Sequence, residues 1–189
     1  MHTLDWKHAW TGRLLTTAPT RPQALKLLEP QLDSCNARLI GEVASGKLPF
    51  LNLPFRSSLT ARLKALTPQL RRFRHMVVLG IGGSALGPAM VQQAMNNLRH
   101  NELPAAKRGC PKIYVEDNVD PERMVSLLNL LDLDKTCFNV ISKSGNTSET
   151  MSQYLIVSDL LKQRYGKNYG GHKRLANDAA KGTLQKICV

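Results

Sequence analysis

The feature that most constrains the fold is an alternation in the second half of the chain. Short apolar runs recur there, and a polar or glycine-rich loop follows each of them. Met76–Leu79, Ile113–Val115 and Cys137–Ile141 are such runs, and a segment with helical periodicity follows each of them. Residues 174–177 form a weaker fourth run. Short strands that alternate with helices are typical of a parallel sheet covered on both faces. The sequence therefore predicts an α/β fold, a three-layer sandwich around a parallel sheet.

The helices expected between these strands are marked by their ends. Residues 85–98 and 148–165 have helical apolar spacing. Asp120 followed by Pro121 begins another helix, because proline is favoured at the first helical position. A glycine-rich turn is expected over residues 166–171.

The first 70 residues lack the alternation and are predicted to be helical and irregular. Apolar residues recur at helical spacing over residues 25–43, where Pro30 is expected to break or begin a helix. Gly46 fits a helix end. We expect a helical arm and connector over residues 1–70 and the α/β domain over residues 71–189.

Three further segments carry weaker predictions. Leu48–Phe55 contains prolines and is expected to be an extended connector whose apolar side chains pack against a core. Residues 4–15 and 181–187 fit short helices. The last residues fit the middle of a helix or strand and not its end, so we expect the domain to be truncated there.

The charge balance limits the partners, because 26 Lys and Arg against 14 Asp and Glu give a net charge of +12. Nucleic acid, an anionic membrane surface and phosphorylated metabolites all attract such a chain. Aromatic residues are few and are not interleaved with the basic clusters, which argues against single-strand binding. We expect most of this charge to lie on a solvated surface, with no nucleic acid and no membrane as partner.

Several classes of protein are excluded by what the sequence lacks. No run of about 18 apolar residues could form a transmembrane helix, and the opening MHTLDWKHAW does not have the pattern of a secretory signal. The 4 cysteines lie far apart without a CxxC pair, so neither a disulfide framework nor a structural zinc site is expected. These features predict a cytoplasmic protein with reduced thiols and no metal.

A glycine-rich loop, Gly80–Gly87, follows the first predicted strand and begins a helix. Glycines let the backbone approach a ligand, and a helix N-terminus presents unpaired N–H groups to an anion. The loop also fits loosely to a dinucleotide-binding pattern, with Ala85 in place of the third glycine. The acidic residue that this pattern requires about 20 positions later is missing, because Glu116 and Asp117 lie farther away. An ordinary strand-to-helix turn is the remaining alternative.

A second loop, Ser142–Thr150, follows the third predicted strand and contains several hydroxyl residues, a lysine and a glycine. Such groups bind phosphate oxygens, and a hydrogen bond to a charged group contributes about 1.5–3 kcal/mol. The alternative is an ordinary helix start, in which Asn146 and Glu149 form a capping box. Open α/β sheets bind ligands at the carboxyl ends of their strands, so both loops are predicted to bind one phosphorylated small molecule.

These motifs resemble those of the glucose-6-phosphate isomerase family, whose core consists of sugar-isomerase (SIS) domains. The segments that carry the resemblance are, in order, Gly46–Pro54, Val78–Gly87, Asp117–Pro121, Ile141–Thr150 and Lys181–Leu184. The resemblance implies a flavodoxin-like SIS domain over residues 71–189. It also implies an isomerase of glycolysis and gluconeogenesis that interconverts glucose 6-phosphate and fructose 6-phosphate.

The resemblance further implies which residues contact the sugar phosphate. By position, Gly83 and Ser84 would border the sugar, and the second loop would hold the phosphate. The substrate-binding residues expected in the second loop are Ser142, Lys143, Ser144, Gly145, Asn146 and Thr147. The family often has threonine at the third of these positions, where Ser144 keeps the hydroxyl.

The reaction that the resemblance implies uses neither metal nor organic cofactor. A base moves a proton between C1 and C2 through an enediol, and a cation stabilises the developing oxyanion. The family supplies these groups from a Gly-Gly-Arg segment, a glutamate, a histidine and a lysine beyond the matched region, and this chain has no Gly-Gly-Arg. We therefore assign no catalytic residue and interpret His75, His100 and His172 as surface histidines. The chain is expected to bind sugar phosphates without converting them, and its full-length form to be a homodimer, as is typical of the family.

Three other functions stay open on the residues alone. A stand-alone SIS module that binds a sugar phosphate for regulation would need a complete sheet. A basic nucleic-acid binder would keep salt-sensitive DNA binding after substitution of Lys143 and Thr147. A dinucleotide oxidoreductase would bind NAD in preference to fructose 6-phosphate.

Overall fold

The structure, a computed structural model, describes residues 21–177. The chain divides between Ala61 and Arg62 into two compact units. The helices predicted over residues 4–15 and 181–187 lie outside the described residues. Within the described part, no helix is long and apolar enough to cross a membrane.

The described part of the N-terminal unit begins with the long helix α1 (Arg21–Ala44). This helix continues through Pro30, so the expected interruption is wrong. The side chains around the proline are exposed, and water can therefore bond the carbonyl that loses its intrahelical donor. The helix ends before Gly46, as predicted, and Gly46 has a φ of +74° and donates its N–H to the Val43 carbonyl.

The segment Leu48–Phe55 is neither extended nor packed against a core, contrary to the expectation. It contains the 3₁₀-helix η1 (Pro49–Phe55), and the fixed φ of Pro49 suits a helix start. None of the residues of η1 is buried, and Phe55 is 83% exposed. Helix α2 (Ser57–Arg71) follows.

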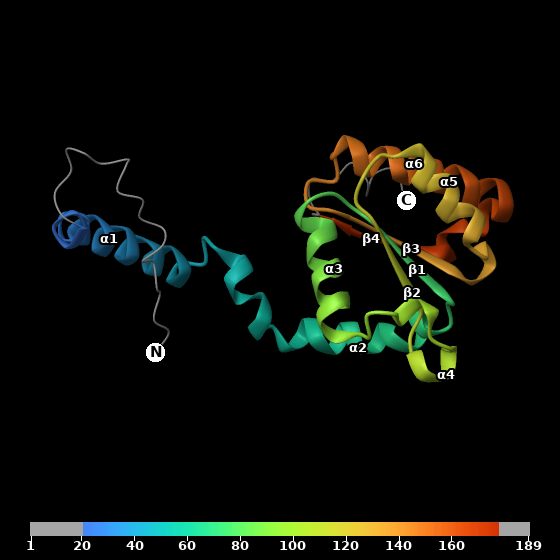
Figure 1. The fold of residues 1–189 in the computed structure, drawn as a ribbon, viewed down its shortest axis with the longest axis horizontal. Coiled ribbons are helices and arrows are strands. Elements are labelled where there is room, and N and C mark those ends of the chain that lie inside the picture. Colours follow the sequence, from blue (N-terminus) through green and yellow to red (C-terminus); the bar gives the residue numbers. More distant parts are fainter. Residues whose placement is uncertain (1–20, 178–189) are drawn as a thin grey trace. The chain divides into compact units, whose positions relative to one another are not determined.

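A sheet of parallel strands forms the centre of the second unit. Its strands are β1 (His75–Leu79), β2 (Lys112–Glu116), β3 (Thr136–Ser142) and β4 (Lys173–Asn177). Within the described residues their order is β2-β1-β3-β4 (Figure 1). The chain leaves β1 toward β2 on one side and then crosses back to β3 on the other, which is the flavodoxin-like order. The predicted α/β class and parallel sheet are confirmed.

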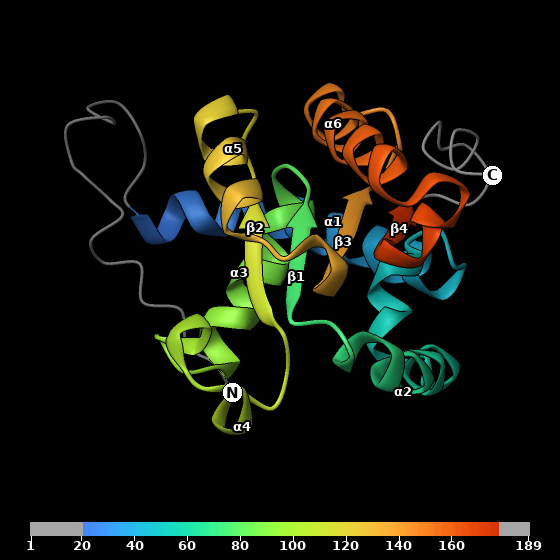
Figure 2. The same ribbon diagram turned by 90° about the vertical axis from the view of Figure 1, so that its right-hand side faces the viewer.

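Helices cover both faces of this sheet (Figures 1 and 2). Helix α3 (Gly83–Met95) lies on one face, and α5 (Pro121–Leu130) and α6 (Ser148–Tyr165) lie on the other. The shorter helical segments are η2 (His100–Glu102), α4 (Ala105–Arg108), η3 (Leu133–Lys135) and η4 (Gly166–His172). The buried apolar core contains Val77, Leu79, Met124, Leu127, Leu131, Phe138, Val140, Tyr154, Val157 and Leu161. The layers therefore form the predicted sandwich.

Local sequence explains where the helices on this face begin. The Asp120 carboxylate accepts the backbone N–H groups of Glu122 and Arg123 at 2.9 and 3.0 Å, and Pro121 is the first residue of α5. Helix α6 has the predicted bounds. These helix starts fix the loops that follow β2 and β3.

Candidate functional site

Both predicted ligand loops lie at the carboxyl-terminal edge of the sheet, on adjacent strands. Strands β1 and β3 pair in parallel, with Leu79 opposite Val140, so the loop after each strand begins at the same edge. The strand order also reverses here, because β1 leads to β2 on one side and β3 leads to β4 on the other. Open α/β sheets bind ligands in the crevice at such a point.

Gly80 brings the two loops into contact. A Cβ at this position would lie 3.0 Å from the Ile141 carbonyl oxygen and 3.1 Å from the Cβ of Ser84. Ile141 directly precedes the second loop, and Ser84 lies in the first turn of α3. The close packing at Gly80 therefore places Ser84 beside the start of the second loop, and it favours a residue without a side chain.

The second loop is organised by the hydroxyl of Ser142, which is 1% exposed. Its Oγ accepts the N–H of Gly145 at 3.1 Å and lies 3.1 Å from Oγ1 of Thr147. Gly145 has a φ of +68°, a conformation that favours glycine. Ser144 Oγ accepts the N–H of Asn146 at 3.2 Å in the exposed part of the loop. The structure thus brings Ser142, Gly145 and Thr147 together and places Ser144 and Asn146 at the rim.

The N-cap of α6 is Thr147, so the alternative in which Asn146 and Glu149 form a capping box is wrong. The Thr147 hydroxyl contacts Ser142 and caps no N–H of the first turn. The Glu149 carboxylate accepts hydrogen bonds from the backbone N–H of Glu149 and from the Ser148 hydroxyl. These bonds hold the pKa of Glu149 below its ordinary value. The cap side chain therefore bonds none of the N–H groups at the positive end of α6, and the Glu149 carboxylate takes only its own.

The first loop ends at the N-terminus of α3. Its N-cap is Gly82, which has a φ of +57° and no side chain with which to cap the helix. A Cβ at Gly83 would meet no atom within 4 Å, so the space beside this residue is open. Gly83 and Ser84, the residues expected to border a sugar, thus lie at an uncapped helix start.

Lys143 supplies positive charge at this edge. Its side chain is exposed, and the ion pairs among the residues that the structure describes involve other cations. An ammonium without a carboxylate partner is available to an anionic ligand.

The carboxylates at the end of β2 are already paired. Arg123 of α5 lies 3.2 Å from both Glu116 and Asp117. Burial raises the pKa of Glu116, and the guanidinium of Arg123 opposes that shift. A dinucleotide ribose would need an available carboxylate, so these ion pairs argue against the oxidoreductase alternative. Across residues 21–177, no group of three or more His, Cys, Asp or Glu side chains is arranged to hold a metal ion.

Gln153 is a positioning residue that the sequence did not indicate. It is buried on α6, and its Nε2 donates to the carbonyls of Glu116 at 3.2 Å and Asn118 at 3.0 Å. It therefore ties the loop after β2 to the helix that begins at the second loop. Its position has the helical spacing of a core residue, and no motif marks it.

The three described histidines lie away from the ligand loops. His75 and His100 are 4% and 3% exposed, so their interpretation as surface residues is wrong. His75 begins β1 inside the sheet, where burial lowers its pKa, and His100 Nε2 lies 3.1 Å from the carbonyl oxygen of Pro111, just before β2. Both residues belong to the amino-terminal edge.

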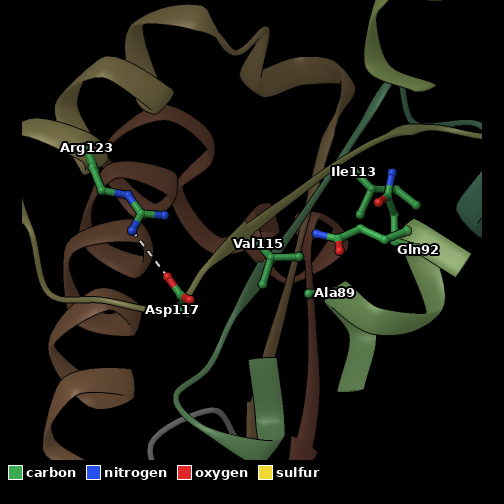
Figure 3. Close-up of a pocket in the computed structure, with 7 residues that line it drawn as sticks. Ala89, Gln92, Ile113, Val115, Asp117 and Arg123 are labelled. Atoms are coloured by element: carbon green, nitrogen blue, oxygen red, sulfur yellow. Dashed lines mark hydrogen bonds and ion pairs between the residues drawn. The ribbon is translucent and has the colours of Figure 1, made fainter. Parts of the chain in front are cut away.

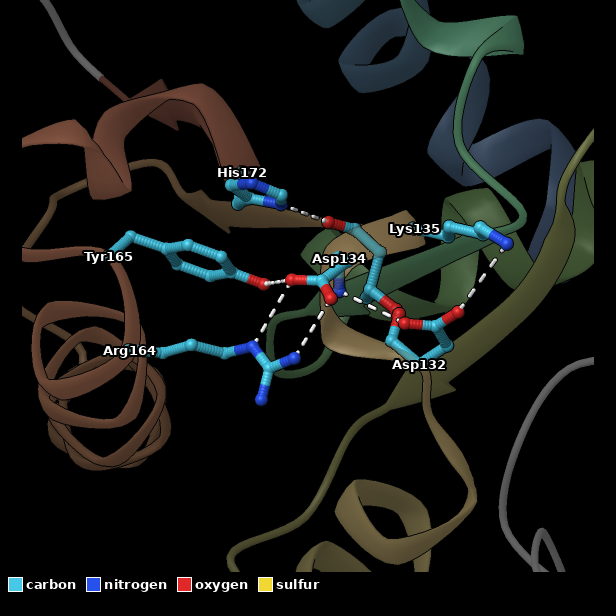
Figure 4. Close-up of polar contacts among 7 residues, drawn as sticks. Asp132, Asp134, Lys135, Arg164, Tyr165 and His172 are labelled. Carbon is cyan, nitrogen blue, oxygen red and sulfur yellow. Dashed lines mark hydrogen bonds and ion pairs between the residues drawn. The ribbon is translucent and has the colours of Figure 1, made fainter.

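A network of polar and aromatic side chains closes that amino-terminal edge (Figure 4). Asp134 accepts hydrogen bonds from Arg164 at 2.8 Å and from the Tyr165 hydroxyl at 2.7 Å, and these bonds lower the pKa of Asp134 to about 2. His172 is half-buried and stacks on Tyr165 with the ring centroids 4.3 Å apart. Its Nδ1 lies 3.1 Å from the Thr136 carbonyl oxygen. These polar groups bond one another, so the network is structural.

Comparison with known proteins places these loops in a family. The phosphoglucose isomerase family model matches residues 64–184. Glucose-6-phosphate isomerase from Carboxydothermus hydrogenoformans is 50% identical over 144 residues, which cover 75% of this chain and 31% of that protein. The Thermus thermophilus enzyme of the same name is 32% identical over 88% of this chain and 38% of that protein. The chain thus spans well under half the length of these relatives.

The solved structures agree with the sequence relatives. A crystal structure of a hypothetical protein from Thermus thermophilus superposes with a TM-score of 0.72 at 28% identity, over 88% of this chain and 38% of that chain. A glucose-6-phosphate isomerase from Chlamydia trachomatis gives a TM-score of 0.52 at 26% identity, over 66% of this chain and 22% of that chain. The family model covers more than half of the chain and both loops of the carboxyl-terminal edge, and the chain therefore belongs to the phosphoglucose isomerase family.

Proposed function

We propose that this chain is the phosphate-binding portion of an isomerase that interconverts glucose 6-phosphate and fructose 6-phosphate. The observation that carries the proposal is that α3 and α6, neither of which has a capping side chain at its N-cap, begin after the adjacent strands β1 and β3, at the point where the strand order reverses. The exposed ammonium of Lys143 lies in the loop between β3 and α6. In this proposal the full-length protein is a cytoplasmic homodimer that needs no cofactor.

The groups in the second loop suit a phosphate monoester, which carries up to two negative charges. The Lys143 ammonium contributes charge, and the N-terminus of α6 contributes its dipole and backbone N–H groups. The hydroxyls of Ser142 and Thr147, which contact each other at 3.1 Å, can rotate to donate to phosphate oxygens. Each hydrogen bond to the charged ester contributes about 1.5–3 kcal/mol. The sugar then extends toward Gly83 and Ser84.

The described carboxylates and histidines near this edge are engaged elsewhere, so none is assigned as a catalytic base. Arg123 pairs with Glu116 and Asp117, and Asp120 accepts two N–H groups of α5. Glu149 accepts its own backbone N–H and the Ser148 hydroxyl, and the described histidines lie at the other edge. We therefore propose that this chain binds the sugar phosphate and does not convert it.

Calorimetric titration with glucose 6-phosphate, with glucose as the control ligand, tests the proposal. We expect binding of the phosphate ester alone. Lys143→Ala should weaken it by about tenfold or more, because a charge-assisted hydrogen bond is lost. Lys107→Ala removes the same charge from the exposed helix α4 and should leave the affinity unchanged.

Equal losses in the two variants would show that only net charge attracts the ligand and would overturn the site. A coupled enzymatic assay checks conversion. Turnover by the pure chain would contradict the absence of a base.

A further inference from the structure

The outer edge of β2 is partly occupied by a side chain. The Nδ2 of Asn101 donates to the Ile113 carbonyl oxygen at 2.7 Å, and the Ile113 N–H donates to Oδ1 of Asn101 at 2.8 Å. One carboxamide therefore satisfies both outward-facing backbone groups of one residue. Strand β2 has a single strand neighbour, β1, so this edge has no ladder partner within the described residues.

Val115 has the same pair of outward-facing backbone groups as Ile113, one N–H and one C=O. The N–H of Lys112 and the carbonyl of Glu116 bond to residues that flank β1. Peptide groups alternate between the two sides of a strand, so those of Ile113 and Val115 face away from β1. Asn101 occupies the first pair, and no hydrogen bond from a described residue occupies the second.

A pocket of about 380 Å³ lies over this edge, and we call it the β2-edge pocket (Figure 3). Its lining residues are Ala89, Gln92, Gln93, Ile113, Val115, Asp117 and Arg123. The first three come from α3 on one face of the sheet, and Arg123 comes from α5 on the other, so the pocket wraps the free edge. Figure 3 shows Gln92 toward one end and Asp117 with Arg123 toward the other. Small-molecule sites have volumes of about 300–1,000 Å³.

We propose that the β2-edge pocket binds a small neutral molecule whose edge carries an N–H donor beside a C=O acceptor, as in a primary carboxamide or a cyclic lactam. The ligand bonds Val115 as Asn101 bonds Ile113. Its N–H donates to the Val115 carbonyl, and the Val115 N–H donates to its carbonyl oxygen. The amide of Gln92 and the carboxylate of Asp117 lie at the ends of the pocket, where they meet further polar groups of the ligand.

Two features favour such a ligand over an added β-strand or an anion. Strand addition uses successive outward-facing residues, whereas β2 presents Ile113 and Val115 alone and Asn101 already occupies the first. The guanidinium of Arg123 is engaged by Glu116 and Asp117, so none of the described residues that line the pocket offers an unpaired cation to an anionic ligand.

An NMR titration of the ¹⁵N-labelled chain tests the proposal, with nicotinamide as the carboxamide probe and uracil as the lactam probe. N,N-Dimethylnicotinamide is the matched control, because it keeps the ring and the carbonyl and lacks the N–H donor. We expect saturable shifts at the Val115 amide and the Gln92 side chain with at least one probe. The Kd should be on the order of millimolar, given the few hydrogen bonds available. The dimethyl analogue should bind about tenfold more weakly than nicotinamide, if nicotinamide is the probe that binds.

A pair of variants localises the ligand. Ala89→Phe fills the pocket and should abolish the shifts, whereas Ala94→Phe places the same ring on the exposed side of α3 and should leave them. Saturating glucose 6-phosphate should not displace the probe, because the two ligands occupy separate sites. A failure of the probe to bind can therefore be distinguished from a failure of glucose 6-phosphate to bind. The absence of saturable shifts at Val115 with both probes would overturn the proposal. Equal binding of nicotinamide and its dimethyl analogue would also overturn it. That comparison uses the unaltered chain, so it does not depend on whether a variant folds.

Discussion

The two edges of one sheet use their polar groups in opposite ways. At the amino-terminal edge, Asp134, Arg164 and Tyr165 bond one another. At the carboxyl-terminal edge, the Lys143 ammonium is exposed and has no ion-pair partner among the described residues, and the N-cap side chain of α6 bonds no N–H of the first turn. Water can satisfy such groups until a ligand replaces it. In this fold, the stabilising network and the proposed binding site therefore lie at opposite ends of the strands.

The close approach at Gly80 is where we expect the largest effect on stability. In Gly80→Ala the new Cβ meets the Ile141 carbonyl oxygen at 3.0 Å, and the free energy of unfolding should fall by about 1–3 kcal/mol. Gly87→Ala is the control, because a Cβ there meets nothing within 4 Å and alanine favours the helix by up to about 1 kcal/mol. Urea unfolding measures both. Equal stabilities would show that the two loops are not in contact.

A smaller loss is expected when the second loop loses its organising hydroxyl. Ser142→Ala removes the acceptor of the Gly145 N–H and the partner of Thr147, which should cost about 1–2 kcal/mol of unfolding free energy. Ser144→Ala, at the exposed rim, should change stability by less than about 0.5 kcal/mol. Faster hydrogen exchange of the Gly145 amide in the first variant alone would locate the effect. Identical exchange in both would contradict the proposed organisation.

The amino-terminal network should give the smallest effect and one that depends on pH. The folded-state pKa of Asp134, about 2, lies below its ordinary value of 3.8. Its stabilising contribution is therefore present above 3.8 and is lost as the pH falls toward about 2. Arg164→Met should move the pKa of this carboxyl toward 3.8 and reduce this part of the acid sensitivity. Carboxyl ¹³C NMR follows the titration, and an unchanged midpoint would show that the ion pair does not set it.

Much of the second unit could be predicted because its signals are local. The apolar runs Met76–Leu79 and Cys137–Ile141 are bounded by polar or glycine residues, and α6 has the predicted bounds, residues 148–165. The ligand loops could be placed at one edge because parallel strands share a direction. The predictions of a helix break at Pro30 and of an extended, packed segment at Leu48–Phe55 were wrong. Both depended on whether the rest of the fold buries these residues, and it leaves Pro30 and Pro49–Phe55 exposed.

Contacts between distant residues could not be predicted in the same way. Gln153 bonds a carbonyl 35 positions away, and Asn101 bonds Ile113 across 12 positions. His75 was expected at the surface because its burial depends on neighbouring strands that periodicity does not specify. The candidate loops were thus recognisable from composition, whereas the residues that position and border them required the fold.

The carboxamide of Asn101 also bears on how copies of this chain behave in concentrated solution. An open rim of a sheet is a template for a further strand, and proteins avoid aggregation by covering or interrupting it. By occupying Ile113, Asn101 shortens the available template on β2 to a single residue, which is too little for one copy to extend the sheet of another. A change at this one position would therefore make the chain less soluble while its interior stayed intact.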